Sequence, residues 1–355
     1  MSKLRVGVIG TGMIGKHHLS QYSQMSTDVE IVAVADIRED EARAVAATYN
    51  VPHVFTDYHK LLALEEIDAV DVCLHNALHC PATLAAFAAG KHVYCEKPLA
   101  LSSKEALKMN EAAAQAGKKL GMQCGTIFSR EVQTTKHLIT AGLLGDIYYA
   151  KASNYRRRGR PYVDGYGTPP FVQKDKAGGG ALMDMAVYHL GLMMYLMDAP
   201  EVLTVSGSTF QKLDMDAQRR QAANYDVEEL GVALVRLGNG ATLAVEEAWA
   251  IHGEAGSRHQ IYGDRGGVCL NPFTFYTNFA GVDGNVTFDL DGWFYRRGQL
   301  TPETAGYSSS QAHWVAGLLG RVPLIDTGKI GLRVCQITEA IYKSAEKGKE
   351  VVVKS

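Results

Sequence analysis

The sequence has little that would tie it to an oxidising compartment, a membrane or a polyanion. Its 355 residues include six cysteines and no CxxC spacing, which is the usage of a reducing compartment. The formal net charge is only -2, so no binding to nucleic acid is expected. No apolar run is long enough to cross a bilayer, and no basic leader precedes the first apolar run. We therefore expect a cytoplasmic protein with a small-molecule partner.

Metal-binding motifs are scarce as well. The twelve histidines include no HExxH, and the pairs His17/His18 and His75/His79 lie in loops of nucleotide-binding character. We therefore expect no catalytic metal.

The chain is long enough for two domains. Up to about residue 125, short β-branched apolar runs alternate with helical stretches, which predicts a doubly wound parallel sheet. Beyond that point, strand-like runs separated by turns such as "LGNGAT" and "YGDRGGV" predict a large open, mainly antiparallel sheet with helices. We expect an α/β protein with domains at 1–125 and 126–355, and a segment at about 326–348 that packs back on the first.

A glycine-rich turn follows the first predicted strand. In "GTGMIG", three glycines have the GxGxxG spacing at the start of a predicted helix, where backbone N–H groups can bind a pyrophosphate. The sequence therefore predicts a dinucleotide-binding loop. The loop residues expected to contact the cofactor are Gly10, Thr11, Gly12, Met13, Ile14 and Gly15.

Asp36 ends the second predicted strand, about 20 residues after the glycines, where a carboxylate can accept both ribose hydroxyls of NAD. It would repel the 2'-phosphate of NADP, although Arg38 could offset part of that repulsion. We favour NAD over NADP. The alternative is that Asp36 only caps the following turn.

The stretch "HVYCEKPLA" places Glu96, Lys97 and Pro98 directly after a buried strand. Pro98 biases the preceding residue toward an extended conformation, so the backbone is expected to give the side chain of Lys97 a fixed direction. Asn76 and His79 follow the previous strand at the same edge, where open α/β sheets bind ligands. Taken alone, Lys97 could still be a solvated rim residue.

Three motifs together, GxGxxG, "EKP" and "GGGALMDMAVYH", resemble the glucose–fructose oxidoreductase, inositol dehydrogenase and MocA (Gfo/Idh/MocA) family over nearly the whole chain. The resemblance implies a Rossmann domain and an α/β domain whose open sheet forms dimers or tetramers. It also implies that Lys97 acts on a sugar or cyclitol hydroxyl and that Glu96 lies near the nicotinamide ribose. The remaining residues expected at the cofactor are Leu74, Asn76, His79, Glu96, Lys97 and Gln123.

The chemistry of a lysine suits that role. Partial desolvation beside a cationic nicotinamide ring would lower its pKa, so that Lys97 takes the hydroxyl proton while hydride leaves carbon. The family's second signature is an Asp followed four residues later by His or Tyr, which here are Asp184 and Tyr188, on one face of an α-helix. His189 would point about 100° around that helix. All four are candidate catalytic residues, while Tyr188 and His189 as plain core residues remain the alternative.

Asp184 lies in an otherwise apolar stretch, so its carboxylate needs a partner, and Lys97 is one candidate. The glycines at 178–180 are expected to let the backbone approach a ligand.

The run "NYRRRGRPYVDGYGTPPF" precedes these glycines and is read as a substrate lid, with a solvated or nucleic-acid-binding segment as the alternative. Trp249 is expected to stack on a pyranose face. The candidate substrate-binding residues are Lys97, Tyr155, Arg156, Arg157, Arg158, Asp184, Tyr188 and Trp249.

The segments "RRRG", "FVQKDKAGGG" and "SGSTFQK" resemble the D-glucoside 3-dehydrogenases of the family. The resemblance implies NAD-dependent oxidation at C3 of a glucoside or related pyranoside. Three alternatives stay open. The protein could be an inositol or other cyclitol dehydrogenase, a glycoside-cleaving enzyme that passes through a transient 3-keto intermediate on bound NAD, or a non-catalytic NAD sensor. A sensor would be expected to lose Lys97 or Asp184.

Overall fold

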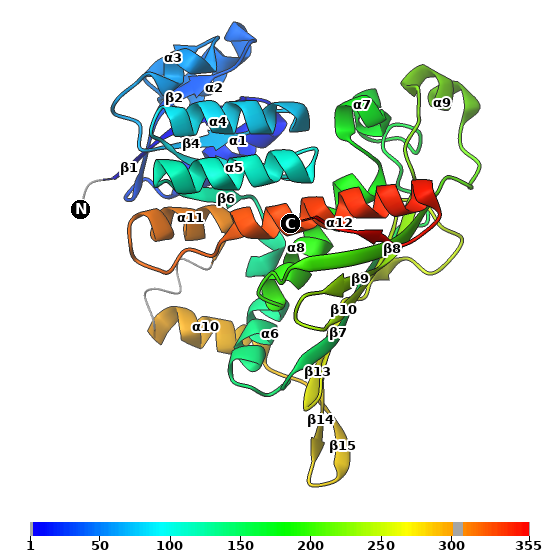
Figure 1. Cartoon of the computed structure of the whole chain (residues 1–355). Coiled ribbons are helices and arrows are strands. Elements are labelled where there is room, and N and C mark those ends of the chain that lie inside the picture. The colour runs from blue at the N-terminus through cyan, green and yellow to red at the C-terminus, as the bar shows by residue number, and fades with distance from the viewer. Residues whose placement is uncertain (1–2, 301–307, 355) are drawn as a thin grey trace. The chain divides into compact units, whose positions relative to one another are not determined.

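A computed structural model describes residues 3–300 and 308–354, and these residues form two compact units (Figure 1). The first unit extends to Gly125 and includes residues 297–300 and 308–332. The second unit comprises residues 126–296 and the chain from Arg333 onward.

The first unit is built on a six-stranded sheet in the order β3-β2-β1-β4-β5-β6, with every neighbouring pair parallel. This is the order of the doubly wound nucleotide-binding fold, so the prediction of a Rossmann domain is confirmed. Strands β1 and β4 are almost wholly buried, because helices cover both faces of a parallel sheet. The strands are β1 (Leu4–Ile9), β2 (Val29–Ala35), β3 (His53–Phe55), β4 (Ala69–Val72), β5 (His92–Cys95) and β6 (Leu120–Met122).

Helices alternate with these strands, as the sequence pattern predicts. They are α1 (Met13–Gln24), α2 (Glu39–Tyr49), α3 (Tyr58–Leu62), η1 (Asn76–Leu78), α4 (His79–Ala88), α5 (Ser103–Ala116) and, late in the chain, α11 (Ser310–Leu318).

The late segment joins the first unit through side-chain hydrogen bonds. Thr327 accepts a hydrogen bond from the main-chain N–H of Met122 at 2.8 Å, and Asn110 donates to the carbonyl of Gly328 at 3.2 Å. Helix α12 (Thr327–Lys347) therefore begins in the first unit, while its residues from Arg333 onward belong to the second.

The second unit contains a ten-stranded sheet in the order β15-β14-β13-β12-β7-β10-β9-β8-β16, with β11 paired to β7. Strands β7 and β10 run parallel and the other pairs antiparallel, which confirms the predicted mainly antiparallel sheet. The strands are β7 (Ile147–Tyr155), β8 (Val202–Phe210), β9 (Leu230–Leu237), β10 (Thr242–Ala248), β11 (Gly256–Ser257), β12 (Gln260–Gly263), β13 (Gly266–Leu270), β14 (Phe273–Phe279), β15 (Val282–Val286) and β16 (Val351–Val352).

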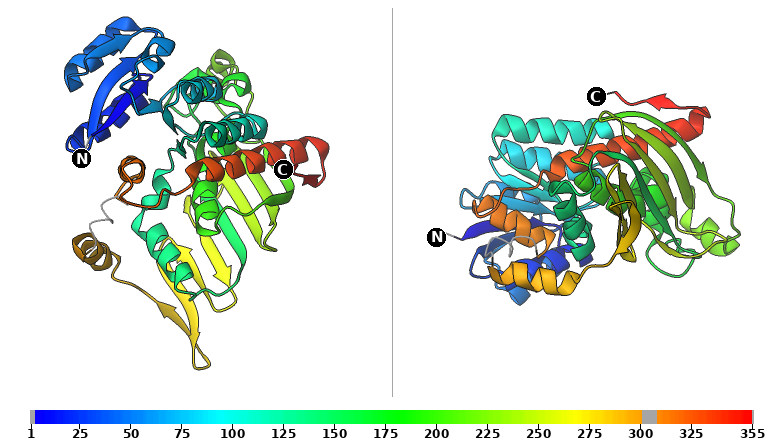
Figure 2. Two further views of the ribbon diagram at one scale, coloured as in Figure 1. Left: turned by 60° about the vertical axis from the view of Figure 1, so that its left-hand side comes forward. Right: turned by 90° about the horizontal axis from the view of Figure 1, so that it is seen from below.

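Helical segments of this unit pack on one face of its sheet (Figures 1 and 2). Along β9, Ala233 and Val235 are buried while Leu234 is exposed, the alternation of a sheet with one open face. On the covered face, Ser344 of α12 accepts a hydrogen bond from the N–H of Gly207 at 2.9 Å. The helical segments of this unit are η2 (Gly125–Phe128), α6 (Arg130–Thr140), η3 (Pro169–Val172), α7 (Lys174–Ala177), η4 (Leu182–Ala186), α8 (Val187–Leu196) and α9 (Ala217–Ala223), and α10 (Leu290–Leu300) begins in it and ends in the first unit.

Within the described part of the chain, no helix combines the length and the apolar character that a bilayer crossing requires.

Candidate functional site

The glycine-rich turn between β1 and α1 packs tightly against the protein at Gly10 and Gly15 but leaves space beside Gly12. Gly10 has φ of 98°, and a Cβ there would overlap the carbonyl oxygen of Cys73; a Cβ at Gly15 would overlap the carbonyl oxygen of Gly10. At Gly12, the nearest described atom is a guanidinium nitrogen of Arg38, 3.9 Å from the added Cβ. A ligand can therefore reach the backbone at Gly12.

The start of α1 offers unpaired N–H groups to such a ligand. Gly12 is the N-cap and has no side chain that could accept from them, and the first turn has no acidic residue. Met13 is 85% exposed and Ile37, beside the end of β2, is 88% exposed. A pyrophosphate at the helix N-terminus and an apolar ring system beside it fit this arrangement, as a dinucleotide requires.

Asp36 lies beside this turn. Its carboxylate accepts hydrogen bonds from the N–H of Thr11 at 2.8 Å and from the N–H of Arg38 at 3.0 Å. Burial alone would raise the pKa of Asp36, but the backbone hydrogen bonds from Arg38 and Thr11 outweigh it, so the pKa lies below its ordinary value. Asp36 thus stabilises the turn, and its carboxylate oxygens retain lone pairs for further donors.

Arg38 faces two carboxylates. Its side-chain nitrogens lie 3.5 Å from Asp36 and 3.5 Å from Glu41. This cation is therefore already partly compensated, which weakens its attraction for an added phosphate.

Lys97 follows the carboxyl end of β5 and is half-buried. The carboxylate of Glu96 accepts a hydrogen bond from the N–H of Lys97 at 2.8 Å, and its other oxygen lies 2.9 Å from Nε2 of His18. The peptide bond between Lys97 and Pro98 is cis. The segment that carries the lysine is thus fixed by the side chain of its own neighbour.

His79 is fully buried, which corrects the expectation that its side chain contacts the cofactor. Its Nδ1 lies 2.7 Å from the carbonyl oxygen of Pro98 and its Nε2 lies 3.0 Å from that of Leu74. Both ring nitrogens therefore face the main chain, and His79 links the loop after β4 to the loop after β5. Burial lowers the pKa of His79.

The other expected cofactor residues also lie in the first unit. Asn76 begins η1 after β4, and Gln123 follows β6, where its side chain accepts a hydrogen bond from the hydroxyl of Tyr94. Both are half-buried and stand at the carboxyl ends of strands.

In the second unit, Asp184 has Trp249 as a partner. The indole Nε1 of Trp249 donates to Oδ2 of Asp184 at 3.2 Å. Trp249 is 0% exposed and packs in a core cluster with Val172 and Tyr225. The prediction that Trp249 stacks on a sugar is therefore wrong, because neither face of its ring is open.

The helix that carries Asp184 is not α-helical at that point. Residues Leu182–Ala186 form a π-helix, in which hydrogen bonds join residues five apart rather than four. The α-helical spacing assumed for Asp184, Tyr188 and His189 therefore does not hold. The wider turn brings His189, five residues on, closer to the face of Asp184 than an α-helix would.

His189 has a buried carboxylate partner that the sequence did not indicate. Oε2 of Glu247 lies 2.7 Å from Nδ1 of His189, and Asn154 donates to the other carboxylate oxygen at 2.6 Å. Burial raises the pKa of Glu247, although the hydrogen bond from His189 acts in the opposite direction. With an ionised Glu247, which can only accept, Nδ1 of His189 is the donor, and a neutral ring then offers Nε2 as an acceptor.

The sequence contained one signal for Glu247. It follows Glu246 in β10, and neighbouring strand residues face opposite sides of a sheet, so one of the two glutamates must face inward. The ring of His259 lies 4.5 Å from the ring of His189, centroid to centroid, and is buried too.

The glycines before this helix serve close packing inside the unit. A Cβ at Gly179 would overlap the hydroxyl of Tyr342, and one at Gly180 would overlap the main chain of Glu228. The Glu228 carboxylate accepts from the N–H of Gly180 and of Leu182, each at 2.9 Å. At Gly179 and Gly180 the expectation that the run admits a ligand is therefore corrected, because the protein's own groups fill the space beside both residues.

The arginine-rich stretch after β7 is anchored at one residue. Arg160 is fully buried and pairs with Asp164 at 3.0 Å and with Glu229 at 2.9 Å. Arg157 and Arg158, in contrast, are exposed. The stretch therefore carries exposed arginines next to a buried, paired one, and its role as a substrate lid stays a prediction.

Two further candidates on this stretch are half-buried. The hydroxyl of Tyr155 donates to Glu246, and Arg156 donates to the hydroxyl of Tyr166 at 2.9 Å. Both side chains are thus oriented by neighbours within the second unit.

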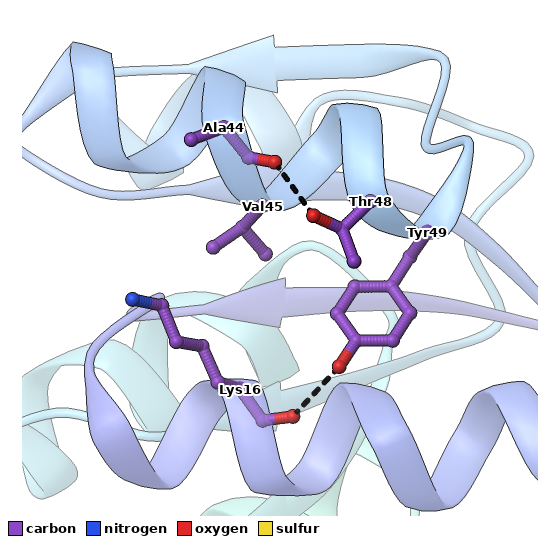
Figure 3. Close-up of a pocket in the computed structure, with 5 residues that line it drawn as sticks. All are labelled: Lys16, Ala44, Val45, Thr48 and Tyr49. Carbon is purple, nitrogen blue, oxygen red and sulfur yellow. Dashed lines mark hydrogen bonds between the residues drawn. The ribbon is translucent and has the colours of Figure 1, made fainter.

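A separate pocket lies between α1 and α2 (Figure 3). It is lined by Lys16, Ala44, Val45, Thr48 and Tyr49. The ammonium group of Lys16 is paired with Glu41. This lining offers no acid–base pair, and we assign it no role in chemistry.

The chain matches two family models. Residues 4–124 match the "oxidoreductase family, NAD-binding Rossmann fold", and residues 132–269 match the "GFO/IDH/MocA C-terminal domain".

Known proteins are similar over most of the chain. A D-glucoside 3-dehydrogenase of Escherichia coli K12 is 32% identical over 99% of this chain and 97% of that protein. A myo-inositol 2-dehydrogenase of Thermotoga maritima is 26% identical over 75% of this chain and 74% of that protein. The solved structure of a levoglucosan dehydrogenase in complex with NADH superposes with a TM-score of 0.82 at 22% identity over the whole of both chains, a similarity of fold.

Proposed function

This chain belongs to the GFO/IDH/MocA family of oxidoreductases, whose first domain is an NAD-binding Rossmann fold, and from that membership we propose that it oxidises C3 of a glucoside or related pyranoside. Membership confirms the resemblance carried by the GxGxxG, "EKP" and "GGGALMDMAVYH" motifs, and the assignment of NAD as cofactor. The observation that carries the choice of substrate is the similarity to a D-glucoside 3-dehydrogenase along nearly the full length of both proteins.

Lys97 is the proposed general base. It takes the proton of the substrate hydroxyl while hydride leaves the same carbon, so a secondary alcohol becomes a ketone. Bound NAD supplies the hydride acceptor. The fixed main chain around Lys97 supports this role, because a catalytic group works best when its position is set in advance.

His189 is the second group proposed to act on the substrate. Its Nδ1 is held by Glu247, so Nε2 can accept a hydrogen bond from a sugar hydroxyl. Tyr188 is proposed to lie beside the substrate too; its carbonyl accepts a hydrogen bond from the hydroxyl of Thr126 at 3.1 Å, and its side chain is half-buried. Asp184 is proposed to contact the substrate as well, with its carboxylate positioned by the indole of Trp249.

Asp36 and Arg38 favour NAD over NADP. The carboxylate of Asp36 is ionised and fixed beside the glycine-rich turn, where it can accept from a ribose diol. Tyr155, Arg156, Arg157 and Arg158 are proposed to surround the sugar, since arginine and tyrosine offer hydrogen-bond donors to a polyhydroxylated ligand.

The protein is further proposed to act in the cytoplasm as a homo-oligomer. Leu203, Leu234 and Val352 are exposed apolar residues on strands of the second unit, and such residues are commonly covered when sheets associate. The partners proposed are a small carbohydrate and a second copy of the chain, with neither nucleic acid nor membrane.

The test is a substrate screen with NAD. Methyl glucosides, free hexoses and inositols are supplied in turn, and NMR locates any new carbonyl. A 3-keto pyranoside supports the proposal. If only inositols react, the substrate is a cyclitol and not a sugar, as the name of the similar Thermotoga maritima protein would suggest. Isotope exchange at C3 with release of aglycone and no net NADH would identify a glycoside-cleaving enzyme, and binding of sugar without turnover would identify a sensor.

A further inference from the structure

A series of hydrogen-bonded side chains, most of them buried, connects β4 to the main chain of Lys97. Asp71 in β4 and His18 in α1 are both 0% exposed. Nδ1 of His18 lies 2.8 Å from the Asp71 carboxylate, and Nε2 lies 2.9 Å from the carboxylate of Glu96. The imidazole therefore bridges two carboxylates, one at the centre of the sheet and one next to the lysine.

This bridge fixes the charge of the ring. A neutral imidazole donates only one hydrogen bond, so two carboxylate acceptors favour the doubly protonated ring. Burial alone would lower the pKa of His18, but the negative charge of Asp71 outweighs it and the pKa lies well above its ordinary value. The hydrogen bond from His18 likewise holds the pKa of Glu96 below its ordinary value, against the effect of burial.

The same atoms could be read as a metal site. Ligand atoms of His18, Asp71 and Cys73 all lie within 4.8 Å of one another. The thiol of Cys73 donates to the Asp71 carboxylate at 3.3 Å, and burial raises the pKa of that thiol, so it stays protonated. Each ligand atom is thus engaged with another member of the set, and hydrogen bonds account for the cluster without an ion.

Glu96 connects this cluster to the lysine. While one oxygen faces His18, the other accepts the main-chain N–H of Lys97 at 2.8 Å. On the far side of the lysine, the carbonyl of Pro98 lies 2.7 Å from His79. The main chain of Lys97 is therefore held on both sides by groups that end in buried imidazoles.

We propose that His18, backed by Asp71, is a positioning residue for the reaction: by holding Glu96 it fixes the main chain from which Lys97 acts. The proposal rests on the proposed role of Lys97 as general base. A positioning role and a purely structural role make different predictions, because misplacing a catalytic group slows chemistry in molecules that are still folded.

The central experiment replaces His18 by glutamine, which can donate to one carboxylate but would turn its carbonyl oxygen toward the other. His17 is the matched control, since it is the neighbouring histidine on α1 and is exposed. We expect His18→Gln to lower kcat by up to about 100-fold at saturating NAD, with little change in KM for the sugar. The primary deuterium isotope effect on kcat should rise as hydride transfer becomes slower, whereas His17→Gln leaves both unchanged.

Two controls keep the outcomes separate. Lys97→Met measured in parallel tests the proposed function: if it retains turnover, the role of Lys97 fails. If Lys97→Met loses turnover while folded His18→Gln keeps kcat and the isotope effect, only the positioning role is overturned.

Where His18→Gln does not fold, Asp71→Asn preserves the shape of the side chain and is expected to give the same loss of kcat. NMR of the unmodified protein with 15N-labelled histidine gives an independent reading. Two ring N–H protons on His18 support the bridge, and a neutral ring overturns it. Displacement of these signals by added zinc would replace the bridge by a metal site.

Discussion

The carboxylate of Glu247 lies 2.7 Å from Nδ1 of His189, and the amide of Asn154 holds its other oxygen. Replacing Glu247 by glutamine introduces an N–H₂ group that can donate to Nδ1 and move the ring proton to Nε2. We expect Glu247→Gln to lower kcat roughly 10- to 1,000-fold, up to the contribution of a general acid or base. Steady-state kinetics with a pH profile checks this. Glu254→Gln, an exposed substitution, is the control, and equal kcat for both variants would argue against the dyad.

Lys97→Met should abolish most hydride transfer and leave NAD binding intact. Methionine keeps much of the length of the side chain but cannot take a proton. The expected loss is about 100- to 10,000-fold in kcat, the usual contribution of a general base. Single-turnover absorbance of NADH and fluorescence titration of the cofactor separate the two effects. Lys104→Met, on the exposed part of α5, should behave like the unmodified enzyme, and a similar loss there would point to a general effect of charge.

Asp36→Ser should shift the cofactor preference toward NADP. The substitution removes a carboxylate that repels a 2'-phosphate and releases Arg38, whose Nε lies 3.5 Å from it. Two unit charges about 4 Å apart repel by ~1 to 4 kcal/mol near a protein surface, which is about 5-fold or more in relative affinity. Titration with NADH and NADPH measures the ratio. Asp40→Ser is the control, and tighter binding of NADPH by the unmodified protein would refute the role of Asp36.

Gly180→Ala should destabilise the second unit, because the added Cβ meets the main chain of Glu228. Overpacking of this kind costs about 1 to 3 kcal/mol in the free energy of unfolding. Thermal unfolding followed by circular dichroism and by tryptophan fluorescence reports it. Gly253→Ala places its Cβ 3.9 Å from Cγ2 of Ile251, an ordinary van der Waals contact, and should be neutral. Normal stability with weakened sugar binding would instead restore the view that the glycines admit a ligand.

His259 should make the protein less stable as the pH falls below neutrality. Burial lowers its pKa to about 3 from 6.5, so below pH 6.5 the unfolded chain takes up a proton that the folded chain does not. The free energy of unfolding should therefore fall by about 1.4 kcal/mol per pH unit from this residue until the folded pKa is reached. Urea unfolding at pH 7.5 and 5.5 should show a smaller difference for His259→Asn than for His252→Asn, an exposed control. Equal differences would mean that His259 accepts a proton in the folded state.

Features of the fold that depend on local chemistry could be predicted from the sequence. Gly10 and Gly15 are predictable because the turn between β1 and α1 is too tight for larger residues. The six parallel strands are predictable because each is a short apolar run between helical stretches. The segment around Lys97 could also be found, since a proline after a lysine at a strand end restricts the backbone.

Features that depend on partners distant in the sequence could not be predicted. Gly179 is required by Tyr342, and Trp249 is buried by residues from η3 and the chain before β9, none of which is near it in sequence. The π-helix at Asp184 changes the angular spacing of a whole signature without altering any residue type. The sequence gives no sign of the role of His18, because its two carboxylate partners lie within β4 and after β5, far from it in the chain.

The central place of β7 in the second sheet has a consequence for synthesis of the chain. Tyr149 of β7 pairs with Thr242 of β10 on one side and with Tyr262 of β12 on the other. The ribosome therefore makes β7 well before it makes either of its neighbours. At a ribosomal rate of ~5–20 residues per second, that interval is roughly 5 to 20 seconds. During this time the backbone N–H and C=O groups of β7 have no sheet partners, and an unpaired strand can pair with strands of other chains. The nascent second unit therefore needs protection from aggregation until β10 and β12 are made.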